Sequence, residues 1–189
     1  MSERQQLDNF ERAVLPHLNA AYNLARWLTR NDADAEDVVQ EAILRAFRYF
    51  EGFSGENPKA WLLSILRNTC FTWLSRNRPA EMAPLDDALS DSVALADEGG
   101  VQTPERAILA ADERGRLDRL IAALPAEFRE VIVLREQEEL SYREISEIIA
   151  VPVGTVMSRL ARARNRLRDA WLREPDKIGR HGPRGSHGS

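Results

Sequence analysis

One predicted helix near the C-terminal end of the chain carries most of the chemistry that this sequence offers. Between Val153 and Arg173 there are six arginines and one acid, so the segment has a net charge of +5 within a chain whose formal net charge is −4. A local excess of guanidinium groups in an acidic protein is an electrostatic signal for nucleic-acid binding. The segment therefore predicts contact with DNA.

Residues 140–168 read as two helices joined by a tight turn. Ser141 and Glu144 form a capping box that starts the first helix, and Pro152 prevents the helix from continuing. Apolar residues at steps of three and four predict a buried stripe on the second helix, made of Val156, Leu160, Ala163, Leu167 and Trp171. Its opposite face carries Thr155, Ser158, Arg159, Arg162 and Arg166. This is the pattern of a helix-turn-helix that binds the DNA major groove; a helix pair with a solvated arginine face is the alternative.

A second candidate surface lies on a helix predicted over 58–76. Its core side is expected to consist of Leu62, Ile65, Leu66, Thr69 and Trp73, and its other side of Ser64, Arg67, Asn68, Phe71 and Ser75. A ring among basic groups suits single-stranded nucleic acid, because cations bind phosphates while the ring stacks on an unpaired base. The alternative is that Phe71 packs against another helix or a protein partner.

The composition argues against an enzyme and against a cofactor. The three histidines cannot assemble a metal site or a catalytic triad, since His181 and His187 lie in the terminal tail. The single cysteine, Cys70, excludes an intrachain disulfide and is expected to be a small core residue in a reducing cytoplasm. No apolar run approaches the length of a transmembrane helix, so no membrane insertion is expected.

The apolar spacing predicts an all-α fold of two small helical domains joined by a flexible acidic linker. The first domain is expected over 1–78, with helices at 7–15, 18–30, 34–50 and 58–76, and the linker over 79–103. The second domain, with the helix-turn-helix, is expected over 104–173, and a disordered tail over 174–189. Between Ala80 and Glu113 there are nine acids and one base, a net charge of −8, which suits a solvated linker.

Three segments together resemble a known family. They are DAEDVVQEAILRAF at 34–47, NPKAWLLSILRNTCFTWLSRNR at 57–78, and the stretch from LIAALPAEFREV to ARARNRLR at 120–168. In order and spacing they are similar to bacterial RNA polymerase sigma factors of the sigma-70 family. The short chain and the acidic linker resemble the extracytoplasmic-function (ECF) subfamily, which has only the second and fourth sigma domains.

The resemblance implies a role for each segment. The first domain would bind core RNA polymerase through Asp37, Gln40, Glu41 and Arg48. It would bind and melt the promoter −10 element through Gly52, Phe53, Ser54, Gly55, Asn57, Arg67, Asn68, Phe71, Arg76 and Arg78. The helix-turn-helix would read the −35 duplex through Thr155, Ser158, Arg159, Arg162 and Arg166. The implied partners are core RNA polymerase, promoter DNA and an anti-sigma factor, in the bacterial cytoplasm.

Three positions depart from the usual family pattern. Ala150 stands where the family often has glycine, which predicts a different or slightly strained turn. Met157 stands where lysine is common, so one phosphate contact is expected to be missing. Thr72 stands where aspartate is common. These departures affect the promoter sequence that is read rather than the fold.

Two other functions are consistent with a helix-turn-helix. A sigma-like decoy that binds an anti-sigma protein would not need the basic DNA face that this chain keeps. A helix-turn-helix repressor would not need the 34–47 and 57–78 segments. The leading interpretation is a promoter-recognition subunit without enzymatic activity. The promoter sequence, the inducing signal, the anti-sigma partner and the role of the tail do not follow from the sequence.

Overall fold

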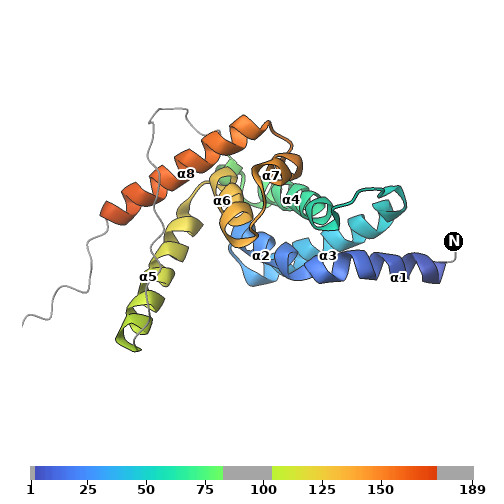
Figure 1. The fold of residues 1–189 in the computed structure, drawn as a ribbon, viewed down its shortest axis with the longest axis horizontal. Helices are drawn as coiled ribbons and strands as arrows, with labels where there is room; N and C mark the ends of the chain where they lie inside the picture. Colours follow the sequence, from blue (N-terminus) through green and yellow to red (C-terminus); the bar gives the residue numbers. More distant parts are fainter. Residues whose placement is uncertain (1–2, 83–103, 174–189) are drawn as a thin grey trace, which may run out of the picture.

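A computed structural model describes residues 3–82 and 104–173, and the secondary structure of these residues is entirely helical (Figure 1). The predicted tail over 174–189, and most of the predicted linker, lie outside the described residues. The helices are α1 (Glu3–Val14), α2 (Leu18–Thr29), α3 (Asp32–Tyr49), α4 (Pro58–Asn77), α5 (Pro104–Ala123), α6 (Ala126–Ile132), α7 (Tyr142–Ile149) and α8 (Val153–Arg173).

Local sequence signals set the helix ends of the first block, which comprises the described residues 3–82. Pro16 lies in a short 3-10 turn, Leu15–His17, and separates α1 from α2 as predicted. Asn31 is the N-cap of α3 and accepts a hydrogen bond from the Asp34 amide, so this helix begins at Asp32, two residues earlier than predicted. Asn57 caps α4 in the same way and Pro58 is its first residue, as expected.

The second block, residues 104–173, contains the predicted helix-turn-helix, α7 and α8. The Ser141–Glu144 capping box is present, with each side chain bound to the other's backbone amide. Helix α6 ends at Ile132, and the chain continues as a π-helical turn, Val133–Gln137. Gln137 at the end of this turn and Glu138 after it carry polar side chains that reach the first block.

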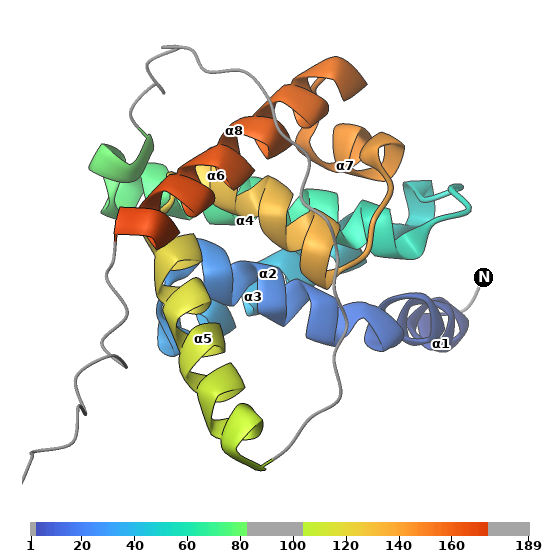
Figure 2. The same cartoon turned by 60° about the vertical axis from the view of Figure 1, so that its left-hand side comes forward.

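The two blocks pack against each other. Helix α6 lies between α8 and α2, and α7 lies against α4 (Figures 1 and 2). Buried side chains of both blocks form one continuous apolar core. The sequence predicted two domains joined by a flexible linker, and it did not indicate that the two would pack together.

Helix α4 is buried on two sides, which corrects the predicted exposure of one face. Leu62 and Leu66 lie in the core as expected, but Leu63, Cys70 and Phe71 are buried too. Phe71 is 8% exposed, so it is a packing residue in this structure rather than an open stacking platform. A helix enclosed by neighbours on two sides loses the single apolar stripe on which a wheel projection relies.

Ala150 closes α7 in the left-handed conformation, with φ 55° and ψ 46°. An L-residue is strained there by about 1–2 kcal/mol relative to helix, whereas glycine is not. We expect Ala150→Gly to raise the free energy of unfolding by about 1 kcal/mol, measured by thermal or urea denaturation. Ala161→Gly, on the exposed side of α8, should instead lower it by about 0.5–1 kcal/mol. Equal effects at both positions would contradict strain at Ala150.

Candidate nucleic-acid interface

The N-terminal half of α8 presents a solvent-exposed face of mixed character. Ser158 and Arg162, both predicted DNA contacts, are exposed on it, and Thr155 is half-buried. Two apolar side chains share the face, Val153 at 41% exposure and Met157 at 52%. Arginine and hydroxyl groups can bind base edges, and exposed apolar groups suit the thymine methyl group. Such a set of groups on one helix suits the major groove, which admits an α-helix.

Arg166 and Arg159, the other two predicted arginines of α8, contact side chains of α6. The guanidinium of Arg166 lies 5.0 Å from the centre of the Phe128 ring. Arg159 is turned towards α6, where Nη2 lies 3.4 Å from Glu127 Oε2 and Nη1 lies 3.6 Å from Glu130 Oε1. Arg159 is therefore not displayed with Ser158 and Arg162 in this arrangement.

Glu130 joins the two predicted DNA-binding elements. Its carboxylate accepts two hydrogen bonds from Arg67 of α4, at 2.9 Å from Nε and 3.2 Å from Nη2. The same carboxylate faces Arg159 of α8, and its side chain is fully buried. Burial raises the pKa of Glu130, while the hydrogen bonds and charge of Arg67, and the charge of Arg159, oppose that rise. One buried carboxylate thus faces an arginine from each element.

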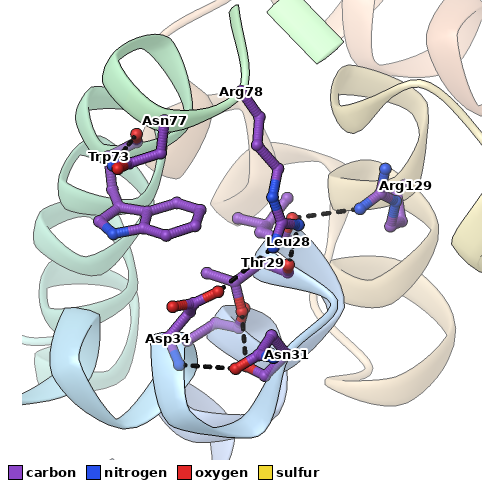
Figure 3. A network of polar contacts seen from close by, with 9 residues as sticks. Leu28, Thr29, Asn31, Asp34, Trp73, Asn77, Arg78 and Arg129 are labelled. Atoms are coloured by element: carbon purple, nitrogen blue, oxygen red, sulfur yellow. Dashed lines mark hydrogen bonds and ion pairs between the residues drawn. The ribbon is translucent and has the colours of Figure 1, made fainter.

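The predicted −10 residues of α4, and Arg78 directly after it, form two groups: some contact other parts of the protein, and the others are exposed. Arg67 stacks on Phe71, with its guanidinium carbon 4.0 Å from the ring centre. Asn68 and Arg76 are exposed. Arg78 donates to the carbonyl of Thr29 and forms an ion pair with Asp34 (Figure 3). Asn68 and Arg76 therefore remain available to a ligand, and Arg67 and Phe71 do not.

The loop before α4 holds an aromatic cluster rather than an open pocket. Phe53 packs on Trp61 at 4.6 Å between ring centres and stacks on Phe50 at 6.1 Å. Gly52, Ser54 and Gly55 are exposed. A Cβ atom at Gly55 would lie 2.9 Å from the Phe53 ring, so this glycine permits the close approach of the loop. Asn57 caps α4 and also donates to Glu144 of α7 at 2.9 Å.

A separate exposed face runs along α3. The four residues predicted to bind polymerase are all exposed on it: Asp37, Gln40, Glu41 and Arg48. Leu44 lies at the centre of the same face at 55% exposure. Glu41 is paired with Arg45 at 2.7 Å. Charged groups around a central exposed leucine are typical of a protein-binding surface.

Contacts between the blocks involve residues that the sequence reasoning did not single out. Arg129 is 1% exposed and donates to the carbonyls of Trp27 and Leu28 at the end of α2 (Figure 3). Helix C-terminal carbonyls lack helical partners, and a cation satisfies them well. The available signal was a charged pair, Arg129 and Glu130, inside an apolar stretch, because charges there must be paired.

Other groups in the described residues offer no further chemistry. No set of histidine, cysteine and acidic side chains in the residues that the structure describes could hold a metal ion. Cys70 is buried, and burial raises the pKa of its thiol, so it is unreactive at neutral pH. Among the helices of residues 3–82 and 104–173, none has the length and apolar character needed to span a membrane.

Known proteins share both blocks. Residues 13–79 match the family described as Sigma-70 region 2, and residues 114–167 match Sigma-70, region 4. The ECF RNA polymerase sigma-E factor of Haemophilus influenzae is 38% identical over 146 residues, 75% of each chain. The ECF RNA polymerase sigma factor SigW of Bacillus subtilis is 34% identical, over 85% of this chain and 88% of its own.

A solved structure also superposes on both blocks. The sigma factor RpoE of Bartonella quintana, in complex with the anti-sigma factor NepR, aligns with a TM-score of 0.63 and 28% identity, over 88% of this chain and 98% of that one. The chain therefore belongs to the ECF group of the sigma-70 family of RNA polymerase sigma factors. This family acts in transcription initiation rather than in an enzymatic reaction.

Proposed function

We propose that this protein binds core RNA polymerase and directs it to a specific class of promoters. The second block would read the −35 element as duplex, and the first would bind core polymerase and the melted −10 element. The observation that supports this most strongly is the exposed face of α8, where Ser158 and Arg162 accompany Met157 on the helix that follows the capped turn. Membership of this family favours this assignment of roles to the two blocks.

The exposed face of α3 is the proposed site of core polymerase binding. It combines Asp37 and Glu41 with the exposed Leu44 on a helix whose opposite side is buried in the core. An apolar centre supplies binding energy, and surrounding charges select the partner. The proposed partner surface is therefore basic around an apolar contact.

The proposed −10 site is the loop 51–57 together with α4. Asn68, Arg76 and the loop residues Ser54 and Gly55 are exposed and could bind a strand directly. Arg67 could join them only after it leaves Glu130, and Phe71 only after the packing around it opens. Trapping an unpaired base selects both its identity and the open state of the duplex, which would couple recognition to melting.

We propose an anti-sigma factor as a further partner, in the bacterial cytoplasm where RNA polymerase works. The basis is the similarity to RpoE, which was solved in complex with the anti-sigma factor NepR. Affinity capture of proteins from a lysate of the source organism, with the purified chain as bait, would test the proposed anti-sigma partner.

Reconstitution with core RNA polymerase tests the proposed function directly. The protein and core enzyme are incubated with fragmented genomic DNA, and transcript 5′ ends are mapped. We expect starts that share a −35 and a −10 sequence and depend on the added chain. Binding to core without any specific start would favour a decoy. DNA binding without core binding would favour a repressor.

Arg162→Ala should weaken −35 recognition by the reconstituted holoenzyme. Arg162 is exposed on the proposed recognition face, and a lost base contact costs about 1–3 kcal/mol, or roughly 5- to 150-fold in affinity. Competition binding with the mapped upstream duplex measures the change. Arg143→Ala is a matched control, because this arginine is 87% exposed on α7 and forms an ion pair with the exposed Glu147. Equal losses in both variants would contradict a specific role for Arg162.

A further inference from the structure

The proposed recognition helix α8 carries an apolar row beside its polar DNA-binding candidates. Val153, Met157 and Ala161 follow one another at steps of four, so they lie in one row along the helix. Val153 is 41% exposed, Met157 is 52% exposed, and Ala161 is exposed too. Ser158 and Arg162 form the adjacent row and are also exposed. The face that would meet a duplex therefore combines an apolar row with a polar one.

Met157 is the centre of this apolar row. Its thioether has no charge and no hydrogen-bond donor, so it cannot hold a phosphate or donate to a base. The side chain is unbranched and adaptable, which suits packing against a small apolar group. Withdrawing such a side chain from water on binding is favourable. The chemistry of Met157 therefore requires an apolar partner rather than a charged or polar one.

The major groove of DNA offers one apolar group, the C5 methyl group of thymine. The other groups that base pairs present there are hydrogen-bond donors and acceptors. In a helix-turn-helix, residues in the N-terminal part of the second helix contact the base edges. Met157 lies in the second turn of α8, which begins at Val153. Its position therefore matches the depth at which thymine methyl groups are found.

We propose that Met157 is a specificity-determining residue of the −35 site, where its side chain packs on the methyl group of a thymine. Val153 and Ala161 flank this contact and exclude water from it. The inference rests on the proposed function, because it assumes that α8 enters the major groove of the upstream duplex. It adds a base preference at a position where the lysine that is common in the family would bind a phosphate instead.

Two neighbours of Met157 favour a close approach of the bases. Gly154 is exposed, and a Cβ atom added there would meet no protein atom within 4 Å, so this side of the first turn is open. The Ser158 hydroxyl donates to the carbonyl of Thr155 at 3.0 Å, which leaves its oxygen as an acceptor. An adenine amino group in the major groove is a donor of the kind that this oxygen can bind. The surroundings of Met157 are thus compatible with an A·T pair.

Replacing thymine by deoxyuridine tests the methyl contact directly. Deoxyuridine pairs with adenine as thymine does but lacks the C5 methyl group. Each thymine of the −35 duplex mapped by transcription is replaced singly, and affinity for the holoenzyme is measured by competition. We expect one replacement at least to lower the affinity about fourfold, the factor for withdrawing one methyl group from water.

Met157→Ala should remove the preference for thymine over deoxyuridine at that position. The variant binds both duplexes with the weaker affinity, because the partner of the methyl group is gone. Leu172→Ala is the matched control, since Leu172 is an apolar residue of the same helix, is 74% exposed and lies in its last turn. This control should keep the fourfold preference. Thermal melting checks that both variants are folded.

Met157→Lys separates methyl recognition from electrostatic attraction. A lysine adds a phosphate contact, so the plot of log affinity against log salt concentration should steepen by about 0.9. The preference for thymine over deoxyuridine should disappear at the same time. Unchanged discrimination in this variant would show that the methyl group is not read by residue 157.

Three results would overturn the inference. One is a mapped −35 sequence without thymine, and another is a wild-type holoenzyme that binds every deoxyuridine duplex as tightly as the thymine duplex. The third is a methyl effect that persists unchanged in Met157→Ala, or a loss of core polymerase binding by this variant with no change in thymine preference. Failure of the proposed function is distinct, because no specific start would then be mapped with any variant. If the inference alone fails, specific starts and the loss of affinity in Arg162→Ala remain.

Discussion

Reversing two charges on α3, Asp37→Arg with Glu41→Arg, should lower the affinity for core RNA polymerase about 100-fold. Both side chains lie on the exposed face around Leu44, whereas the opposite side of α3 is buried. Juxtaposed like charges at an interface cost several kcal/mol, and about 2.7 kcal/mol corresponds to this loss. Pull-down of core polymerase with titrated protein measures the effect.

A control variant tests whether the loss of affinity depends on where the charges lie rather than on how many are reversed. Asp8→Arg with Glu11→Arg makes the same charge change on α1, where both side chains are exposed. This variant should bind core polymerase at close to wild-type strength. The α3 variant should also keep its thermal stability, because the changed residues contribute nothing to the buried core. Wild-type binding by the α3 variant would refute the proposed polymerase site.

Phe71→Ala should lower the free energy of unfolding by about 3 kcal/mol. The ring is 8% exposed, belongs to the continuous core, and lies under the Arg67 guanidinium at 4.0 Å. Truncating a buried phenylalanine typically costs about 3–5 kcal/mol through lost apolar burial and the cavity left behind. Urea denaturation followed by circular dichroism measures the change.

A second phenylalanine provides the comparison. Phe47 is 38% exposed and contacts Phe10 edge-on at 5.1 Å, so Phe47→Ala should cost about 1 kcal/mol. If Phe71→Ala left stability unchanged but blocked strand opening, Phe71 would be a stacking residue and its burial would not contribute to folding.

Much of the helical framework could be predicted because the signals are local. Asn57 and Pro58 begin α4, Ser141 and Glu144 begin α7, and Pro16 separates α1 from α2. Such signals act between residues at most four positions apart, where the backbone itself brings the groups together. The family also followed from the sequence, because its motifs occur in a distinctive order and spacing.

The exposed faces of α3 and α8 could be predicted as well. Each of these helices has one apolar stripe, so the residues opposite it were expected to face solvent. Asp37, Glu41, Ser158 and Arg162 are exposed accordingly. The prediction was incomplete where an apolar residue stands on the polar side, as Leu44 and Met157 do. A wheel projection assigns such residues no role.

The sequence by itself therefore determined the helices, their capped ends, the helix-turn-helix and the family. Only the tertiary structure decided that Phe71 is buried and that Arg159 of α8 meets Glu130 of α6. It also decided that the two blocks pack together, so that Arg67 reaches the same carboxylate. Arg67 and Glu130 are more than 60 positions apart in the sequence. Periodicity describes each helix alone, and it carries no information on which second helix will cover a face that looks polar. The burial of these side chains is a property of the packed helices.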